Sequence, residues 1–355
     1  MLSIKQNGAY ANADIPLGIT ILTSEPIMHV LFPSFYSTHC EYCLDDFDKL
    51  YRCAGCKLVH YCSKEHQKLA WKKYHSQECK LLFKVNSVDL LLLMRVVNSD
   101  INLDDLYKPI VSKNFDQNLE IAQYAINNKL IISKDIRILT NILSVFESNN
   151  FVITDKMLDN IAVGIYPTAA KLNHSCQPNC IKIYNQGVQY IRSIKTIKYG
   201  EELYHSYIDN GLPKKLRIYN LCKVHDFICK CKKCELEILD LYLDNVSQKL
   251  ISYQQLFNGY MLKDDYKNAI LICRKICTIY SHIYSDLDSH SNYNDLVENT
   301  YHPLYGLQLY ILASLSHKIK YSLLSLNVLK ITHGPLHPLY IEAHNFWLSL
   351  GDNSK

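Results

Sequence analysis

The chain has 355 residues, of which 48% are hydrophobic and 20% charged, and its net charge is +4. The composition is that of a folded protein rather than a disordered one, and the length predicts two or three domains. The mild net charge does not by itself indicate a nucleic-acid partner. No secretory signal is visible at the start, and the longest apolar run, around residues 90–97, is too short to span a bilayer. We therefore expect a soluble intracellular protein.

Taken in chain order, the expected elements change type several times. Residues 1–35 alternate apolar and polar positions between Gly and Pro, which predicts short strands and turns. A Cys- and His-rich module follows at 40–79 and ends in a helix, and a helical region covers 86–147. Strand patterns return between 149 and 207. A second Cys cluster closes 216–234, and helical pairs run from about 245 to the end.

The first Cys-rich module has the spacing of a metal site. The chain contains 14 Cys, and in a reducing compartment clustered Cys more often bind metal than form disulfides. Four close pairs suffice for two tetrahedral zinc sites, because both side chains of a pair can point at one ion. In so short a segment, metal binding would supply on the order of 10 kcal/mol of folding free energy per site. The pairs are Cys40-x2-Cys43, Cys53-x2-Cys56, Cys62-x3-His66 and His75-x3-Cys79.

This segment resembles the MYND zinc finger. The shared features are the paired ligands, Tyr61-Cys62-Ser63 before the helix, Gln67, Ala70-Trp71 and the closing His75-x3-Cys79. MYND fingers interleave their ligands, so the resemblance implies one ion held by Cys40, Cys43, Cys62 and His66. It implies a second ion held by Cys53, Cys56, His75 and Cys79. His66 stands where the family usually has Cys, and imidazole is an acceptable zinc ligand.

The strongest catalytic signal lies further along the chain. It is Leu172-Asn173-His174-Ser175-Cys176-x-Pro178-Asn179, followed by Gly200-Glu201-Glu202-Leu203, Tyr207 and Phe227-x-Cys229-x-Cys231-x2-Cys234. A lone Asn-His pair is more often structural than functional, but together these motifs resemble a SET domain with its post-SET zinc segment. Ser148 to Ile153, Gly164 to Pro167 and Ile331-Thr332-His333-Gly334-x2-His337 match the same SET and MYND domain-containing family. The resemblance thus covers nearly the whole chain.

The resemblance implies an α+β fold. It consists of a SET-domain β-fold with an inserted MYND finger and a post-SET zinc site, followed by an all-α, TPR-like helical C-terminal domain. The expected domains are the N-terminal part of SET at 1–39, the MYND finger at 40–79, a helical SET insert at 80–147, the core SET at 148–212, the post-SET zinc segment at 213–240 and the helical domain at 241–355.

A third zinc site is expected from Cys176 together with Cys229, Cys231 and Cys234, which lie far from it in the sequence. Four thiolates complete one tetrahedral site, which would tie the Asn173-His174 loop to the segment that carries Phe227. The three ligand sets leave Cys180, Cys222, Cys273 and Cys277, which we interpret as small buried residues or inert thiols.

The family resemblance implies a protein-lysine methyltransferase that uses S-adenosylmethionine. The lysine amine must be neutral although its free pKa is about 10.4, and an apolar channel beside a sulfonium favours the neutral form. Positioning must also bring the methyl group in line between sulfur and nitrogen. Tyr207 is implied to be catalytic, because its hydroxyl can hold the partly positive methyl group by weak C–H···O contacts. The alternative is a Tyr packed in a strand.

The resemblance also implies the cofactor contacts. These are Lys5, Asn7, Asn149, Asn173, His174, Tyr207 and Phe227, with Phe227 packed against the adenine. His225 would line the substrate channel in place of a Tyr that the family often has, which makes the channel wall smaller and titratable. Gln6 stands where the family's turn has its first Gly, a costly exchange if that position needs a positive φ. The strand before this turn looks short or absent.

Three functions follow from these motifs. The first is an enzyme with three zinc ions and S-adenosylmethionine that acts on a lysine of a histone tail or a non-histone protein. We expect it to be a monomer in the cytoplasm and nucleus, without membrane association. The second is a MYND-based adaptor or transcriptional regulator that docks Pro-containing peptides and has a weak or inactive SET core. The third is a DNA-binding regulator, which rests on seven Lys or Arg against two Glu between Arg52 and Lys80.

Overall fold

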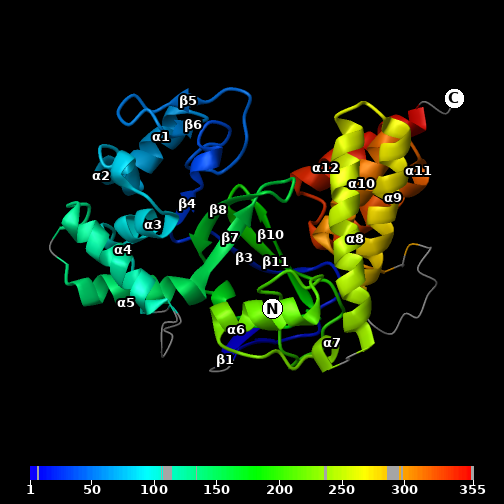
Figure 1. Ribbon diagram of the computed structural model, residues 1–355, viewed down its shortest axis with the longest axis horizontal. Helices are drawn as coiled ribbons and strands as arrows, with labels where there is room; N and C mark the ends of the chain where they lie inside the picture. Colours follow the sequence, from blue (N-terminus) through cyan, green and yellow to red (C-terminus); the bar gives the residue numbers. More distant parts are fainter. Residues whose placement is uncertain are drawn as a thin grey trace. The chain divides into compact units, whose positions relative to one another are not determined.

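The structure is a computed structural model that describes residues 1–5, 8–104, 106, 114–132, 134–235, 238–285, 296 and 299–352. Within these ranges, strands and helices alternate in blocks along the chain (Figure 1). The strands are β1 (Leu2–Lys5), β2 (Gly8–Ala11), β3 (Thr20–Ser24), β4 (His29–Leu31), β5 (Tyr51–Arg52), β6 (His60–Tyr61), β7 (Asn150–Thr154), β8 (Asn160–Ile165), β9 (Asn173–His174), β10 (Cys180–Asn185), β11 (Val188–Ser193) and β12 (Tyr204–His205).

Most of the helices fall into the regions where the sequence predicts them, but two helices also form around 216–234, where only a Cys cluster was expected. The helices are α1 (Lys64–Ala70), α2 (Ser76–Glu78), α3 (Val88–Val97), α4 (Phe115–Asn127), α5 (Ile136–Asn149), α6 (Lys214–His225), α7 (Lys232–Glu235), α8 (Ile238–Met261), α9 (Tyr266–Ile283), α10 (Pro303–Ser316), α11 (Ile319–Thr332) and α12 (Pro338–Asp352). The α+β class with a helical C-terminal region is therefore confirmed. The short first strand is present, since β1 pairs with β2 in antiparallel register.

The chain divides into two compact units. The first comprises Met1–Leu22, Leu172–Ile183 and Tyr190–Lys355, and the second comprises Thr23–Lys171 and Tyr184–Gln189. The strands form small sheets with the orders β1-β2, β10-β11-β3, β12-β9, β4-β8-β7 and β5-β6. The finer domain boundaries expected from the family resemblance stay predictions.

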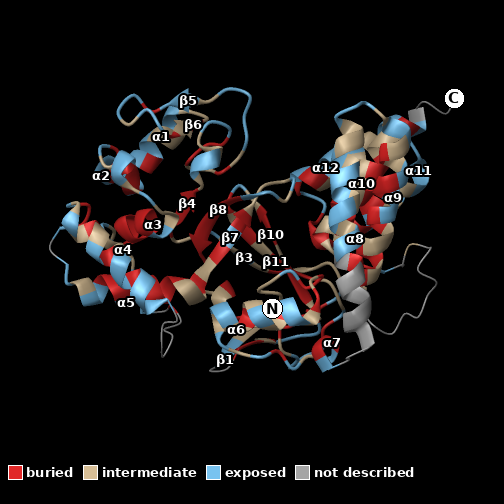
Figure 2. Ribbon diagram, viewed as in Figure 1, coloured by how far each residue is buried: buried red, intermediate tan, exposed pale blue. Residues whose placement is uncertain are grey.

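The second unit is built around helix α3. Its sequence is almost entirely apolar, and Ser87 caps its N-terminus by accepting a hydrogen bond from the backbone N–H of Leu90. Figure 2 shows α3 as a buried helix, and it belongs to the same hydrophobic core as Met28, Tyr61 and Phe146. The Cys-rich module and helices α4 and α5 share this core.

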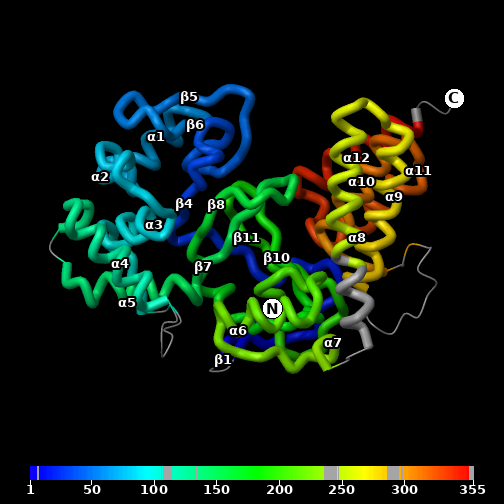
Figure 3. Tube along the Cα trace, in the orientation of Figure 1, coloured from blue at the N-terminus to red at the C-terminus, as the bar shows by residue number. Residues whose placement is uncertain are grey.

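The first unit carries the C-terminal helices. From α8 to α12 each helix packs against the next one along the chain, as the Cα trace in Figure 3 makes plain. Their core contains Cys273 and Cys277, which are fully buried as small apolar side chains are. Among the described helices, none is both long and apolar enough to cross a membrane.

Candidate functional site

Two short strands bring the predicted catalytic motifs together in the first unit. Strand β9 runs parallel to β12, with Asn173 opposite Tyr204 and His174 opposite His205. Asn179 fixes this arrangement, because its amide oxygen accepts from the N–H of Tyr204 and its Nδ2 donates to the carbonyl of Glu202. The Asn-His motif and the segment that leads to Tyr207 therefore share one small scaffold.

His174 connects Tyr207 to a predicted metal ligand. Its Nδ1 accepts a hydrogen bond of 3.0 Å from the backbone N–H of Tyr207, so its proton must sit on Nε2. Nε2 lies 3.2 Å from Sγ of Cys176, where it can donate to the sulfur. The buried imidazole thus couples the backbone of Tyr207 to the Cys cluster.

The Tyr207 side chain lies between aromatic and histidine rings. Its ring centroid is 4.8 Å from that of His225 and 4.9 Å from that of His205, and Phe227 meets it edge-on at 6.3 Å. The hydroxyl donates a 2.8 Å hydrogen bond to the carbonyl oxygen of Leu172. The Tyr207 hydroxyl oxygen and the Leu172 carbonyl oxygen, which both keep lone pairs, are thus held side by side next to the Asn173-His174 loop.

Asn173 is held by a carboxylate to which the sequence analysis gave no role. Its Nδ2 donates to Glu202 Oε1 at 2.6 Å, and the Tyr204 hydroxyl donates to Glu202 Oε2 at 2.5 Å. The backbone of Gly8 approaches this pair closely: a Cβ there would lie 2.5 Å from Glu202 Oε1 and 2.8 Å from Asn173 Nδ2. Gly8 also has a φ of +152°, so two independent features of this site require glycine.

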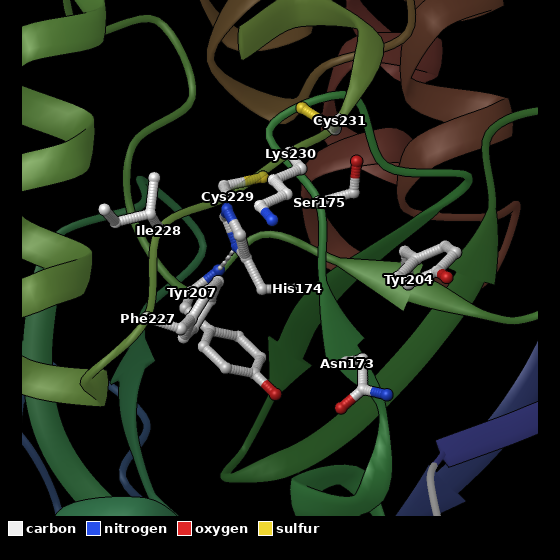
Figure 4. Close-up of a pocket in the computed structure, with 10 residues that line it drawn as sticks. All are labelled: Asn173, His174, Ser175, Tyr204, Tyr207, Phe227, Ile228, Cys229, Lys230 and Cys231. Carbon is white, nitrogen blue, oxygen red and sulfur yellow. Dashed lines mark hydrogen bonds between the residues drawn. The ribbon is translucent and has the colours of Figure 1, made fainter. Parts of the chain in front are cut away.

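A pocket of about 540 Å³ opens over this scaffold. Figure 4 shows Tyr207 and Phe227 on one side of it and Asn173 and Tyr204 on the other. Its volume and its mixture of aromatic and polar walls fit a small-molecule ligand. The lining residues are Asn173, His174, Ser175, Tyr204, Tyr207, Phe227, Ile228, Cys229, Lys230 and Cys231.

Four of the predicted cofactor residues line this pocket together, and two of the described ones do not. Asn7 and the neighbouring Gln6 lie outside the described residues. Lys5 is in the first unit, but its ammonium lies over the Tyr10 ring at 4.7 Å and it is not among the residues that line the pocket. Asn149 belongs to the second unit, at the end of α5, where its Nδ2 donates to the carbonyl of Val145. The roles of Lys5, Asn7 and Asn149 stay predictions.

His225 ends helix α6 beside Tyr207 and Phe227. Burial, together with the nearby His174 and Lys182, lowers the pKa of His225 to about 4. The imidazole is therefore neutral near pH 7. It touches two residues of the pocket wall but is not itself among the residues that line the pocket, so its role in a substrate channel stays a prediction.

The structure brings together each of the three predicted metal-ligand sets, with all ligand atoms of a set within 4.8 Å of one another. Zn–S bonds of about 2.3 Å in a tetrahedron place two sulfurs roughly 3.7 Å apart. The sulfurs of Cys53 and Cys79 are 3.8 Å apart, and those of Cys176 and Cys234 are 3.5 Å apart. The donors and their spacing thus fit zinc. The sets are Cys40, Cys43, Cys62, His66; Cys53, Cys56, His75, Cys79; and Cys176, Cys229, Cys231, Cys234.

The two histidines present different nitrogens to their sets. His66 turns Nδ1 towards Cys40 and Cys62, at 3.7 and 3.0 Å. His75 turns Nε2 towards Cys53 and Cys56, at 3.3 and 3.7 Å. The other nitrogen of His75 meets the carboxylate of Glu78 at 3.3 Å, the outer-shell arrangement that orients metal-binding imidazoles.

A buried ion network supports the finger from within the second unit. Arg95 of α3 donates to both carboxylate oxygens of Glu78 and to Glu41 Oε1. Glu41 follows the ligand Cys40, and Glu78 precedes the ligand Cys79. All three side chains are almost completely buried. The sequence offered one signal that was not used: a lone Arg inside the apolar run 90–97.

Two buried cations accompany the third ligand set. Nη2 of Arg217 lies 3.7 Å from Sγ of Cys234, and Lys233 donates to the carbonyls of Asn210 and Ile283. Four thiolates around Zn²⁺ would carry a net charge of −2, which these cations offset. Sequence reasoning missed both residues, because their partners lie far away in the chain.

Comparisons with known proteins agree with this geometry. Residues 40–79 match the model of the MYND finger family. The chain is 27% identical over 66% of its length to mouse histone-lysine N-methyltransferase SMYD3, and spans 60% of that protein. It is 29% identical over 64% of its length to the fission yeast SET domain and MYND-type zinc finger protein 6, and spans 50% of it. Human N-lysine methyltransferase SMYD2 is 29% identical over 65% of the chain, which spans 58% of that relative.

A solved structure is also similar. It is the SET domain of LSMT bound to lysine and AdoHcy, with a TM-score of 0.34 and 13% identity over 64% of this chain and 52% of that one.

Proposed function

We propose that this chain, which belongs to the family of SET and MYND domain-containing proteins, is a protein-lysine methyltransferase that uses S-adenosylmethionine. The names of its relatives support lysine as the methyl acceptor, and one of these names specifies a histone lysine. The observation that carries the proposal is the junction of Tyr207, His174 and Cys176 beside the pocket. It places Tyr207 in the wall of a cavity that is lined by aromatic and polar residues.

The pocket supplies the groups that the cofactor needs. Asn173 would offer polar atoms and His174 its backbone, since both ring nitrogens of His174 are engaged, and Phe227 would offer an aromatic face for adenine. Lys5, Asn7 and Asn149 are proposed as further contacts on the family resemblance. When bound, S-adenosylmethionine supplies an electrophilic methyl group on a positively charged sulfur.

The residues around Tyr207 are suited to a neutral amine. The rings of Tyr207, Phe227 and the neutral His225 would form apolar walls that exclude water, which disfavours the charged form of a lysine. The Tyr207 hydroxyl and the Leu172 carbonyl lie 2.8 Å apart, so both oxygens can face the same methyl group. Their weak C–H···O contacts would stabilise the positive charge that develops on that methyl group.

Zinc is proposed at all three ligand sets, where it would be structural. Each set supplies four Cys or His ligands, so no coordination position is left open for a substrate. The ion at Cys176, Cys229, Cys231 and Cys234 would hold the Phe227 segment against the loop of Asn173 and His174.

The test is incubation of the zinc-loaded protein with labelled S-adenosylmethionine and an array of proteins, with modified lysines identified by mass spectrometry. Calorimetry should show that S-adenosylmethionine binds. Asn173→Ala should weaken that binding by about 1–3 kcal/mol, because it removes a half-buried hydrogen-bond donor of Glu202. Asn127→Ala, an exposed change in α4, is the control. Absence of binding by the wild-type protein would favour the adaptor hypothesis.

A further inference from the structure

A lysine of the protein itself contacts the backbone of the residue that precedes the proposed catalytic tyrosine. Lys182 projects from β10, and its Nζ donates a 2.8 Å hydrogen bond to the carbonyl oxygen of Ser206, the residue that precedes Tyr207. Cys180, Ile181 and Ile183, its neighbours along the strand, are buried apolar side chains, so Lys182 is a charged residue in an apolar strand. The mechanism described above does not use it.

The groups around Lys182 make its charge significant. The positive charge of Lys182 acts on His205 of β12 and on His225 of α6. His174 of β9 lies near both of these histidines. Burial first, and then Lys182, lowers the pKa of His205 well below its usual value, and burial, His174 and Lys182 lower that of His225 to about 4. Both imidazoles are therefore neutral near pH 7. Burial lowers the pKa of Lys182 itself to about 8, which leaves it mostly protonated at that pH.

We propose that the positive charge of Lys182 favours the deprotonated form of the substrate lysine in the proposed site. The Ser206 carbonyl holds this charge next to the Tyr207–His225 pair. The inference rests on the proposed methyltransferase function. A like charge nearby disfavours an ammonium ion, so the bound amine releases its proton to water more readily. The amine nitrogen then forms its bond to the methyl carbon, and the electron pair of the broken C–S bond returns to sulfur.

This role has a characteristic pH dependence. Below about pH 8, Lys182 is charged and lowers the pKa of the bound amine. As the pH rises through that value, Lys182 loses its proton and the effect disappears. A shift of one unit in the amine pKa changes the neutral fraction near pH 7 about tenfold.

The experiment compares wild type with Lys182→Met, which keeps the length of the side chain and removes the charge. A protein identified as a substrate serves for the kinetics, after matched zinc content and melting temperature have shown that both forms fold. At pH 7 the variant should lose about tenfold in kcat without an increase in KM. The loss should shrink above about pH 8. Lys198→Met, which removes an exposed ammonium paired with Asp14, should behave as wild type.

A second measurement does not depend on activity. NMR titration of the His225 imidazole should show its pKa rising in Lys182→Met and staying constant in Lys198→Met. An unchanged His225 pKa, an equal loss of kcat at every pH, or a higher kcat at pH 7 would each overturn the proposal. If wild type methylates no protein, the proposed function fails. The His225 titration would still decide whether Lys182 lowers the pKa of a neighbouring group in this site.

Discussion

The backbone N–H of Tyr207 donates a 3.0 Å hydrogen bond to Nδ1 of His174, a residue 33 positions earlier in the chain. The other nitrogen of the same imidazole lies 3.2 Å from Cys176. One side chain therefore fixes the position of the proposed catalytic residue relative to a proposed zinc site. We therefore expect the activity of the protein to depend on the metal at the Cys176 site, although that metal would not touch the substrate.

Tyr207→Phe should remove most methyl transfer and leave cofactor binding intact. The variant keeps the ring that packs against His225 and loses the hydroxyl that meets the Leu172 carbonyl. Loss of one preorganised contact of this kind costs about 3 kcal/mol, or roughly a hundredfold in rate. Single-turnover rates and calorimetry would measure the two effects separately. Tyr199→Phe, at an exposed tyrosine, is the control. A wild-type rate in Tyr207→Phe would make Tyr207 a packing residue.

Gly8→Ala should weaken S-adenosylmethionine binding. The added methyl group would meet both Glu202 Oε1 and Asn173 Nδ2 at less than 3 Å, and the backbone conformation at φ +152° is strained for alanine. We expect a loss of about 1 kcal/mol or more in binding free energy. Gly259→Ala in α8, where a Cβ would meet nothing within 4 Å, should bind normally. Equal affinities of the two variants would show that Gly8 does not support the pocket.

Elemental analysis should find three zinc ions per chain. Cys234→Ser should reduce the count towards two, while His66→Cys should keep three because it restores a thiolate to the first set. Chelators should unfold the finger before the C-terminal helices, whose core is independent of the ligand sets. A count of two in the wild-type protein would disprove one of the proposed sets.

His225→Tyr should change the proportions of mono-, di- and trimethyllysine more than the rate of the first turnover. The substitution reshapes a wall next to Tyr207 and leaves the Tyr207 hydroxyl in place. The pKa of His225 is about 4, so the imidazole is already neutral above that value. The altered proportions should therefore be the same at pH 6 and pH 8. Mass spectrometry of the products would reveal a pH-dependent difference if His225 acted through its charge.

The sequence predicted the four close ligand pairs because metal coordination leaves a local spacing pattern, two ligands on one turn. The division of these pairs between two ions came from the resemblance to the family, and so did the joining of Cys176 to Cys229, Cys231 and Cys234. Asn173, His174, Tyr207 and Phe227 were predicted as one site by resemblance, and the structure places them around one pocket.

The partners of these residues were not predictable. Glu202 acts through both of its carboxylate oxygens, Arg217 meets Cys234, and Lys182 reaches the Ser206 carbonyl. Each contact joins segments whose proximity is decided by strand pairing or helix packing. Spacing in the sequence carries no record of such contacts. A charged residue inside an apolar run could have marked Lys182, and likewise Arg95 in the ion network of the finger.

Arg95 lies outside the finger, yet it donates hydrogen bonds to two carboxyl groups that adjoin zinc ligands within it. Cutting the segment 40–79 out of the chain would leave Glu41 and Glu78 without their guanidinium and would leave a buried cation in α3. Breaking a buried pair of this kind costs about 3–5 kcal/mol. The finger is therefore not an independent module. If it were grafted onto another protein, helix α3 would have to be transferred together with it.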